Sequence, residues 1–116
     1  MVEKRKFKRL DTSKIEVAWK KESLPSSASL SKNISAGGIC LILDNKDALN
    51  EGDFLNLEFK LPTSECISAK GRVAWSEEIE IVGRQGKSRE AGIEFIDISD
   101  NVRQSISQFV FSALRT

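Results

Sequence analysis

The sequence predicts a mainly β protein, a small antiparallel barrel of six or seven strands with one C-terminal α-helix. Apolar and polar residues alternate with a period of two in several segments between residues 15 and 95. Turn-forming residues separate these segments at short intervals, as they do in small barrels. From Asp100 onward the apolar period changes to the 3.6 residues of a helix. With 116 residues, the chain is expected to form one domain with a single core.

The first half of the chain contains four alternating segments that we expect to be strands. They span residues 15–20, 28–33, 39–43 and 55–61. Turn formers separate them at residues 21–27, 44–47 and 52–53. In the first segment Ile15, Val17 and Trp19 share one face, and in the second Ala28 and Leu30 begin the alternation. These five side chains are therefore expected to point into the barrel.

The second half predicts one long strand and a hairpin. On the long strand Ile67, Ala69, Gly71, Val73 and Trp75 share one face, and Gly71 marks a bend of the barrel wall. The hairpin follows, and its inner face is expected to comprise Ile79, Ile81, Ala91, Ile93 and Phe95.

The C-terminal segment has the pattern of an amphipathic helix. One stripe contains Val102, Ile106, Phe109, Val110 and Ala113. Its N-terminal cap is expected among Asp97, Ser99 and Asp100. We expect this helix to close the open end of the barrel, in preference to binding a partner. The predicted organisation is one domain, residues 1–116, with a flexible N-terminal segment (1–12), a barrel (13–97) and a helix (99–115).

Composition is typical of a soluble globular protein. Hydrophobic residues make up 40% of the chain and charged residues 30%. The longest apolar run, residues 39–43, is far too short to cross a bilayer, and the charged N-terminus lacks the apolar segment of a signal peptide. We therefore expect a cytoplasmic protein without membrane insertion.

Charge is distributed unevenly along the chain. Residues 4–9 contain five of the 18 basic groups and no acidic group. The rest has 13 basic and 17 acidic groups, which leaves a formal charge of −4. A local cluster of this kind suits a compact anion better than a nucleic-acid backbone, which would need a basic stripe across the domain.

The side chains that much of catalysis requires are missing. The chain has no histidine, and its two cysteines, Cys40 and Cys66, are not in a metal-ligand spacing. No Ser-His or Cys-His pair can therefore form, and an enzyme is the function we least expect. Cys40 is expected to be a small buried hydrophobic residue.

Two short motifs carry the candidate binding residues. The segment RKFKR, residues 5–9, offers two guanidiniums, which can bind phosphate through paired hydrogen bonds and stack on aromatic rings. The segment NISAGG, residues 33–38, offers the amide of Asn33, the hydroxyl of Ser35 and a glycine backbone without Cβ atoms. Together these groups match the phosphates and base edge of a nucleotide.

The order RxxxR and then (D/N)xSxxG resembles the PilZ domain, the bacterial receptor module for cyclic di-GMP. Both motifs are complete, and the resemblance extends to the strands at residues 71–75 and 91–95 and to the closing helix. The resemblance implies a PilZ-type barrel whose ligand is cyclic di-GMP, with no further cofactor.

The resemblance also implies roles for single residues. Arg5 and Arg9 would bind the phosphates and stack on guanine. Asn33 and Ser35 would read guanine edges or phosphate oxygens, and Gly38 would let the backbone approach the ligand. Possible additional contacts are Lys4 and Gly37. A basic residue before the first arginine is frequent in family members that bind two ligand molecules, so Lys4 slightly favours two.

The function that follows is that of a regulatory receptor. Ligand binding would order the N-terminal segment and so control a downstream protein partner in motility, biofilm formation or a related bacterial process. The identity of that partner stays open. The main alternative is a PilZ-like interaction scaffold that binds no nucleotide. A further alternative, a barrel for single-stranded nucleic acid, would need exposed aromatic residues, whereas the alternation places most of them inside.

Overall fold

The computed structural model describes residues 9–11, 15–21, 26–44, 49–62, 66–79 and 88–114, without the side chains of 9–11, 44 and 114. The described residues form seven strands and one helix. They are β1 (Arg9–Asp11), β2 (Glu16–Lys20), β3 (Ser27–Ser35), β4 (Gly38–Asp44), β5 (Phe54–Lys60), β6 (Cys66–Ile79), β7 (Ser88–Asp97) and α1 (Asp100–Leu114).

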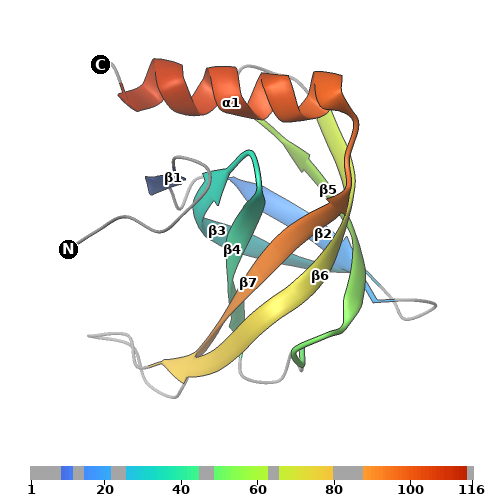
Figure 1. The fold of residues 1–116 in the computed structure, drawn as a ribbon. Coiled ribbons are helices and arrows are strands. Elements are labelled where there is room, and N and C mark those ends of the chain that lie inside the picture. Colours follow the sequence, from blue (N-terminus) through green and yellow to red (C-terminus); the bar gives the residue numbers. More distant parts are fainter. Residues whose placement is uncertain are drawn as a thin grey trace.

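Strands β2 to β7 form a closed antiparallel barrel (Figure 1). The strand order is β1-β3-β2-β5-β6-β7-β4, and pairing between β3 and β4 closes the ring. Strand β1 adds to β3 outside this ring. The predicted fold class, a six- or seven-stranded barrel with a C-terminal helix, is confirmed.

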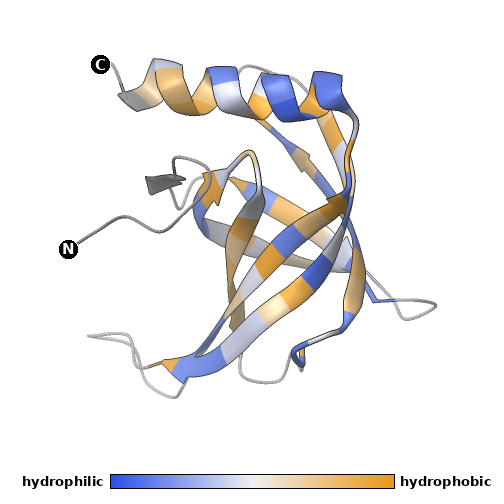
Figure 2. Cartoon of the chain, viewed as in Figure 1, coloured by the Kyte–Doolittle hydropathy of each residue, from blue (hydrophilic) through white to orange (hydrophobic). Residues whose placement is uncertain are grey.

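The alternation of the sequence becomes the inner and outer faces of the barrel. Figure 2 shows hydrophobic and hydrophilic residues alternating along β5, β6 and β7. On β5 the predicted inward residues Leu55, Leu57 and Phe59 are buried, and the residues between them are exposed. Phe59 stacks on Phe95 of β7 with ring centroids 6.3 Å apart. The period of two therefore predicted this part of the core correctly.

Helix α1 lies across one end of the barrel (Figure 1) and contacts β1 and β3. Its side chains Ile106 and Val110 are buried in the barrel core. The hydroxyl of Ser99 accepts a hydrogen bond from the Val102 N–H at 3.2 Å, so Ser99 is the N-cap among the three predicted candidates. Phe111 lies on the outer side of the helix, half exposed.

The prediction for the inward residues of β3 is wrong. Ala28 and Leu30 face solvent, and Ser29 and Ser31 are buried instead. Ser29 is buried because its hydroxyl accepts a hydrogen bond from the Trp19 indole N–H at 2.9 Å. A buried indole N–H needs such a partner, and hydropathy alone does not report this requirement.

Trp75 is the second wrong assignment. The pairing of β6 with β7 shifts register at Lys70/Gly71, beside the predicted bend, where the extra residue is Ile96 of β7. It shifts again between Val73 and Trp75, where the extra residue is Ala74 of β6. The second irregularity reverses the alternation, and the Trp75 residue is 40% exposed on the outside of the barrel. A bulge shifts every following side chain to the other face, which a strict period of two cannot anticipate.

The structure also contains a strand that the sequence pattern did not predict. We expected residues 1–12 to be a flexible segment and the first strand to begin near Ile15. Of that segment the structure describes Arg9–Asp11, as strand β1 paired antiparallel with β3. The flexibility expected for the remainder stays a prediction.

Candidate functional site

Strand register places both sequence motifs side by side on the outer face of the barrel. Two rows of neighbouring residues cross strands β1, β3, β4, β7 and β6 in that order. The first row contains Arg9, Ser35, Gly38, Glu94 and Arg72, and the second contains Asp11, Asn33, Cys40, Gly92 and Trp75. Residues about 60 positions apart in the sequence thereby become neighbours at the strand spacing of about 4.8 Å.

The two rows border a groove on the barrel surface. It has a cavity volume of about 250 Å³ and is lined by Asn33, Ser35, Gly38, Ile39, Cys40, Ala74, Trp75, Gly92, Ile93 and Glu94. The small residues Gly38, Cys40 and Gly92 lie in the middle of the rows, between the polar residues of β3 and the indole of Trp75. The indole of Trp75 packs over Gly92, and the hollow beside it, next to Gly38 and Cys40, can accept a flat ring.

The β-bulge in β3 turns Asn33 toward this groove. The register of β3 against β4 shifts between Ser31 and Asn33, so Lys32 is an extra residue. Lys32 is held by Glu90 of β7, with Nζ and Oε1 2.7 Å apart. After the bulge, Asn33 lies opposite Cys40, and both belong to the outer row.

The turn between β3 and β4 holds the Ser35 hydroxyl in place. Ser35 Oγ accepts a hydrogen bond from the Gly37 N–H at 3.2 Å, and its own O–H points to the Gly38 carbonyl at a long 3.5 Å. The Gly37 carbonyl accepts from the Phe95 N–H at 2.9 Å, which fastens the turn to β7. The long bond costs little to exchange, so the hydroxyl can donate to a ligand while the turn stays intact.

Two glycines of the groove are required by close packing. A Cβ atom at Gly38 would overlap the backbone carbonyl oxygen of Ile93, and one at Gly92 would overlap the indole of Trp75. The role in ligand approach predicted for Gly38 stays a prediction. The structure supplies a further reason for this glycine, because strands β4 and β7 need it to pair.

The predicted site residues fall into three groups. Asn33, Ser35 and Gly38 line the groove, and Gly37 belongs to the turn beside it. The backbone of Arg9 pairs opposite Ser35. Lys4 and Arg5 lie outside the described residues.

Among the lining residues that sequence reasoning did not assign to the site, Trp75 and Glu94 have the functional side chains. Trp75 was assigned to the core because no signal in the sequence reveals the bulge before it. Glu94 alternates with Ile93 and Phe95, a pattern that indicates only a solvent-facing position. Its position beside Gly38 depends on pairing between β4 and β7, which the sequence pattern does not specify.

Sequence comparison identifies the family, since the PilZ domain matches residues 3–112. The chain belongs to the PilZ domain family. The resemblance seen in the two motifs is thereby confirmed over nearly the whole chain. Comparison with curated proteins gave no match.

Solved structures share the fold of this PilZ domain. The Bacillus subtilis inhibitor of motility MotI/DgrA has a TM-score of 0.83 at 23% identity, covering 98% of this chain and 53% of that chain. The PilZ domain of YcgR from Escherichia coli, solved with c-di-GMP, has a TM-score of 0.82 at 15% identity. The match covers 97% of this chain and 93% of the YcgR domain. The K. pneumonia MrkH–c-di-GMP complex has a TM-score of 0.83 at 15% identity. The match covers 98% of this chain and 54% of MrkH. The chain thus spans about half the length of MotI/DgrA and MrkH.

Neither a metal-binding cluster nor a membrane-spanning helix is present in the described part of the chain. No group of three or more acidic, cysteine or histidine residues there could hold a metal ion. Among the same residues, no helix has the length and apolar character needed to cross a membrane.

Proposed function

We propose that this PilZ domain is a receptor for cyclic di-GMP and that the groove of the two rows is its binding site. The observation that carries the proposal is the strand register. It brings the last arginine position of RxxxR opposite Ser35 and places Asn33, Ser35 and Gly38 along one hollow. Structural neighbours that were solved with c-di-GMP support the choice of ligand.

The chemistry of the groove suits a nucleotide with two phosphates. Arginine side chains of the first motif, Arg5 and Arg9, would neutralise phosphate oxygens through paired guanidinium hydrogen bonds, and the backbone of Arg9 pairs beside the groove. Asn33 and Ser35 offer uncharged donors and acceptors for a guanine edge or a phosphate oxygen. Trp75 offers a half-exposed aromatic face across the small floor, on which a purine can stack.

Regulation would follow from the N-terminal segment. Ligand that binds the arginines and the groove together would fix this segment against β3, and helix α1 contacts both β1 and β3. The same event could therefore change the surface offered to a cytoplasmic partner in motility or biofilm control. The structural similarity to MotI/DgrA, an inhibitor of motility in Bacillus subtilis, supports this class of process.

Isothermal titration calorimetry tests the proposal. Cyclic di-GMP should bind with a defined stoichiometry of one or two molecules, and cyclic di-AMP and GTP should bind far more weakly. Absence of binding, or equal binding of all three nucleotides, would leave the interaction scaffold as the better reading.

A further inference from the structure

We infer that Glu94 is a specificity-determining residue that reads the hydrogen-bond donors of a guanine base. The inference rests on the proposed function, because it concerns the same groove. It adds a recognition group that neither motif contains.

The position of Glu94 is fixed by β-sheet pairing. Glu94 lies directly opposite Gly38 of the second motif, and its row continues to Ser35 and then to β1. Because Gly38 has no side chain, nothing on β4 separates the carboxylate of Glu94 from the hydroxyl of Ser35 in this row. Glu94 also lines the groove together with Asn33 and Trp75.

A carboxylate matches guanine and rejects adenine. The Watson–Crick edge of guanine presents two adjacent donors, N1–H and the exocyclic N2 amine, and a carboxylate has two acceptor oxygens at a matching separation. Adenine presents an acceptor, N1, at the corresponding position, which would face a negative oxygen. A group that attracts one base and repels the other gives stronger selection than attraction alone.

The charges along the first row suit a guanine nucleotide, which has negative phosphates on one side and the hydrogen-bond donors of the base on the other. Arg9 belongs to β1 at one end of this row. Toward the other end is Glu94, the charged residue among the described residues that line the groove. The two residues are three strand spacings apart, about 14 Å. When the phosphates are bound at the Arg9 end, the donor edge of the base can point toward Glu94.

The present partner of Glu94 can be exchanged at little cost. Its Oε2 is 3.1 Å from Nη2 of Arg72, and the two side chains are 52% and 49% exposed. Exposed ion pairs of this kind contribute little to stability. The carboxylate can therefore turn from Arg72 to a base, while Arg72 keeps the neighbourhood neutral for a ligand with two negative charges.

Calorimetry with base-modified ligands tests the inference. The probes are cyclic di-GMP and cyclic di-IMP, whose hypoxanthine base lacks only the N2 amine. The parent chain should bind cyclic di-GMP about tenfold or more tightly than cyclic di-IMP, which corresponds to one charge-assisted hydrogen bond. In Glu94→Gln the amide group faces one of the two donors, so that ratio should fall to nearly one.

Two controls separate base reading from other effects. Glu58→Gln makes the same charge change on the exposed face of β5, and Arg72→Gln breaks the ion pair but keeps the carboxylate. Glu58→Gln should retain the parental affinities and ratio. Arg72 belongs to the binding row, so Arg72→Gln can weaken both ligands equally, but it should retain the parental ratio. An unchanged ratio in Glu94→Gln, or an equally reduced ratio in Arg72→Gln, would overturn the inference while leaving the receptor proposal standing. A parent chain that binds neither ligand would overturn both.

Discussion

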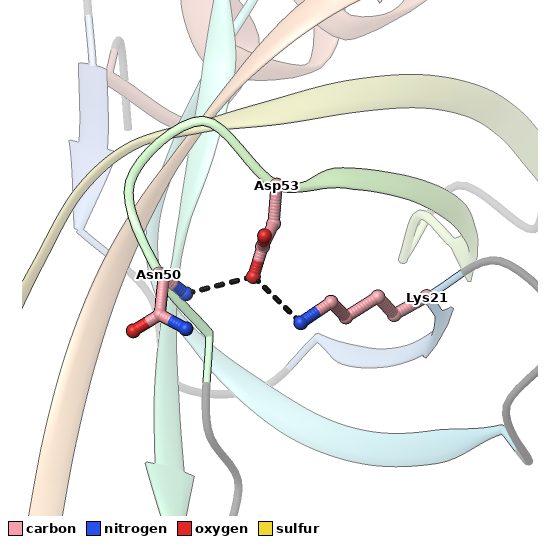
Figure 3. Close-up of polar contacts among 3 residues, drawn as sticks. All are labelled: Lys21, Asn50 and Asp53. Atoms are coloured by element: carbon pink, nitrogen blue, oxygen red, sulfur yellow. Dashed lines mark hydrogen bonds and ion pairs between the residues drawn. The ribbon is translucent and has the colours of Figure 1, made fainter.

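Two polar turns of this domain use similar residues for different purposes. The turn before β5 contains Asn50, Gly52 and Asp53, and the turn between β3 and β4 contains Ser35, Gly37 and Gly38. In the first turn, Asp53 Oδ2 accepts from the Asn50 N–H at 2.9 Å and lies 2.9 Å from Lys21 Nζ (Figure 3). In the second, the neighbouring polar side chains line an open groove.

The glycines of the two turns are required for different physical reasons. Gly52 has a φ of +94°, a backbone angle that favours glycine, and nothing lies near its missing Cβ. Gly38 is a glycine because the Ile93 carbonyl occupies the place of a Cβ. Both turns contain internal hydrogen bonds, but the Asp53 carboxylate is used by its own turn and by Lys21, whereas Ser35 of the second turn also lines a hollow and is available to a ligand. The following predictions test this distinction, from the largest expected effect to the smallest.

Replacement of the groove glycine should have the largest effect. Gly38→Val forces side-chain atoms against a backbone carbonyl that cannot move without breaking β4–β7 pairing, and we expect a loss of about 3 kcal/mol or more in stability. Gly52→Ala meets no neighbouring atom and should cost about 1–2 kcal/mol through its backbone angle. Urea unfolding measures both values. Equal losses in the two variants would contradict the packing role of Gly38.

Removal of a motif arginine should weaken ligand binding and leave the fold intact. Arg5→Ala or Arg9→Ala should each reduce cyclic di-GMP affinity by about 2–3 kcal/mol, or about 30- to 150-fold, the scale of a lost charge-assisted contact. Lys60→Ala, on the exposed face of β5, is the control for a lost positive charge. If either arginine variant titrates like the parent, that arginine does not bind phosphate.

Removal of the Asn33 amide should change selectivity more than affinity. Asn33 is not ionised, so Asn33→Ala should narrow the preference for cyclic di-GMP over cyclic di-AMP by about 1 kcal/mol, one neutral hydrogen bond. Competition between the two ligands measures the preference. An unchanged preference would assign Asn33 to the backbone of the β3 bulge alone.

The Asp53 cluster should affect stability slightly and binding not at all. The hydrogen bond from the Asn50 backbone N–H lowers the pKa of Asp53 from its usual 3.8, and the hydrogen bond and positive charge of Lys21 also lower it. Its folded-state pKa is below the unfolded value, so its stabilisation is present above pH 3.8 and is lost as the pH falls through the folded pKa. Asp53→Asn should therefore cost about 1 kcal/mol or less near neutral pH.

Unfolding of the parent and Asp53→Asn at neutral pH and at about pH 3 checks the sign of this effect. The difference in stability between the two proteins should shrink in acid. A difference that stays constant or grows would show that the charge of Asp53 does not stabilise the turn.

The sequence predicted much of the fold because one side of each strand is buried. Regular alternation identified the inward residues of β5 and most of the inner face of β7. It failed at Leu30 and Trp75, where a buried hydrogen bond or a bulge overrides hydropathy. Such irregularities depend on the neighbouring strand and leave no local signal.

For the site, the sequence named the motif residues but not their neighbours. Asn33, Ser35 and Gly38 could be predicted because their types and spacing are themselves the signal. Trp75 and Glu94 line the same groove only because β6 and β7 lie beside β4, and that arrangement is a property of the closed barrel.

The central claim is that ligand acts on the groove turn and the N-terminal segment and leaves the Asp53 turn unaffected. Amide hydrogen exchange with and without cyclic di-GMP compares these regions in one experiment. Residues 2–10 and 33–38 should gain protection with ligand, because phosphates would bind the arginines and stabilise the existing pairing of β1 with β3. Residues 50–53 should exchange equally in both states. Equal exchange in all three regions, or protection confined to residues 50–53, would contradict the account.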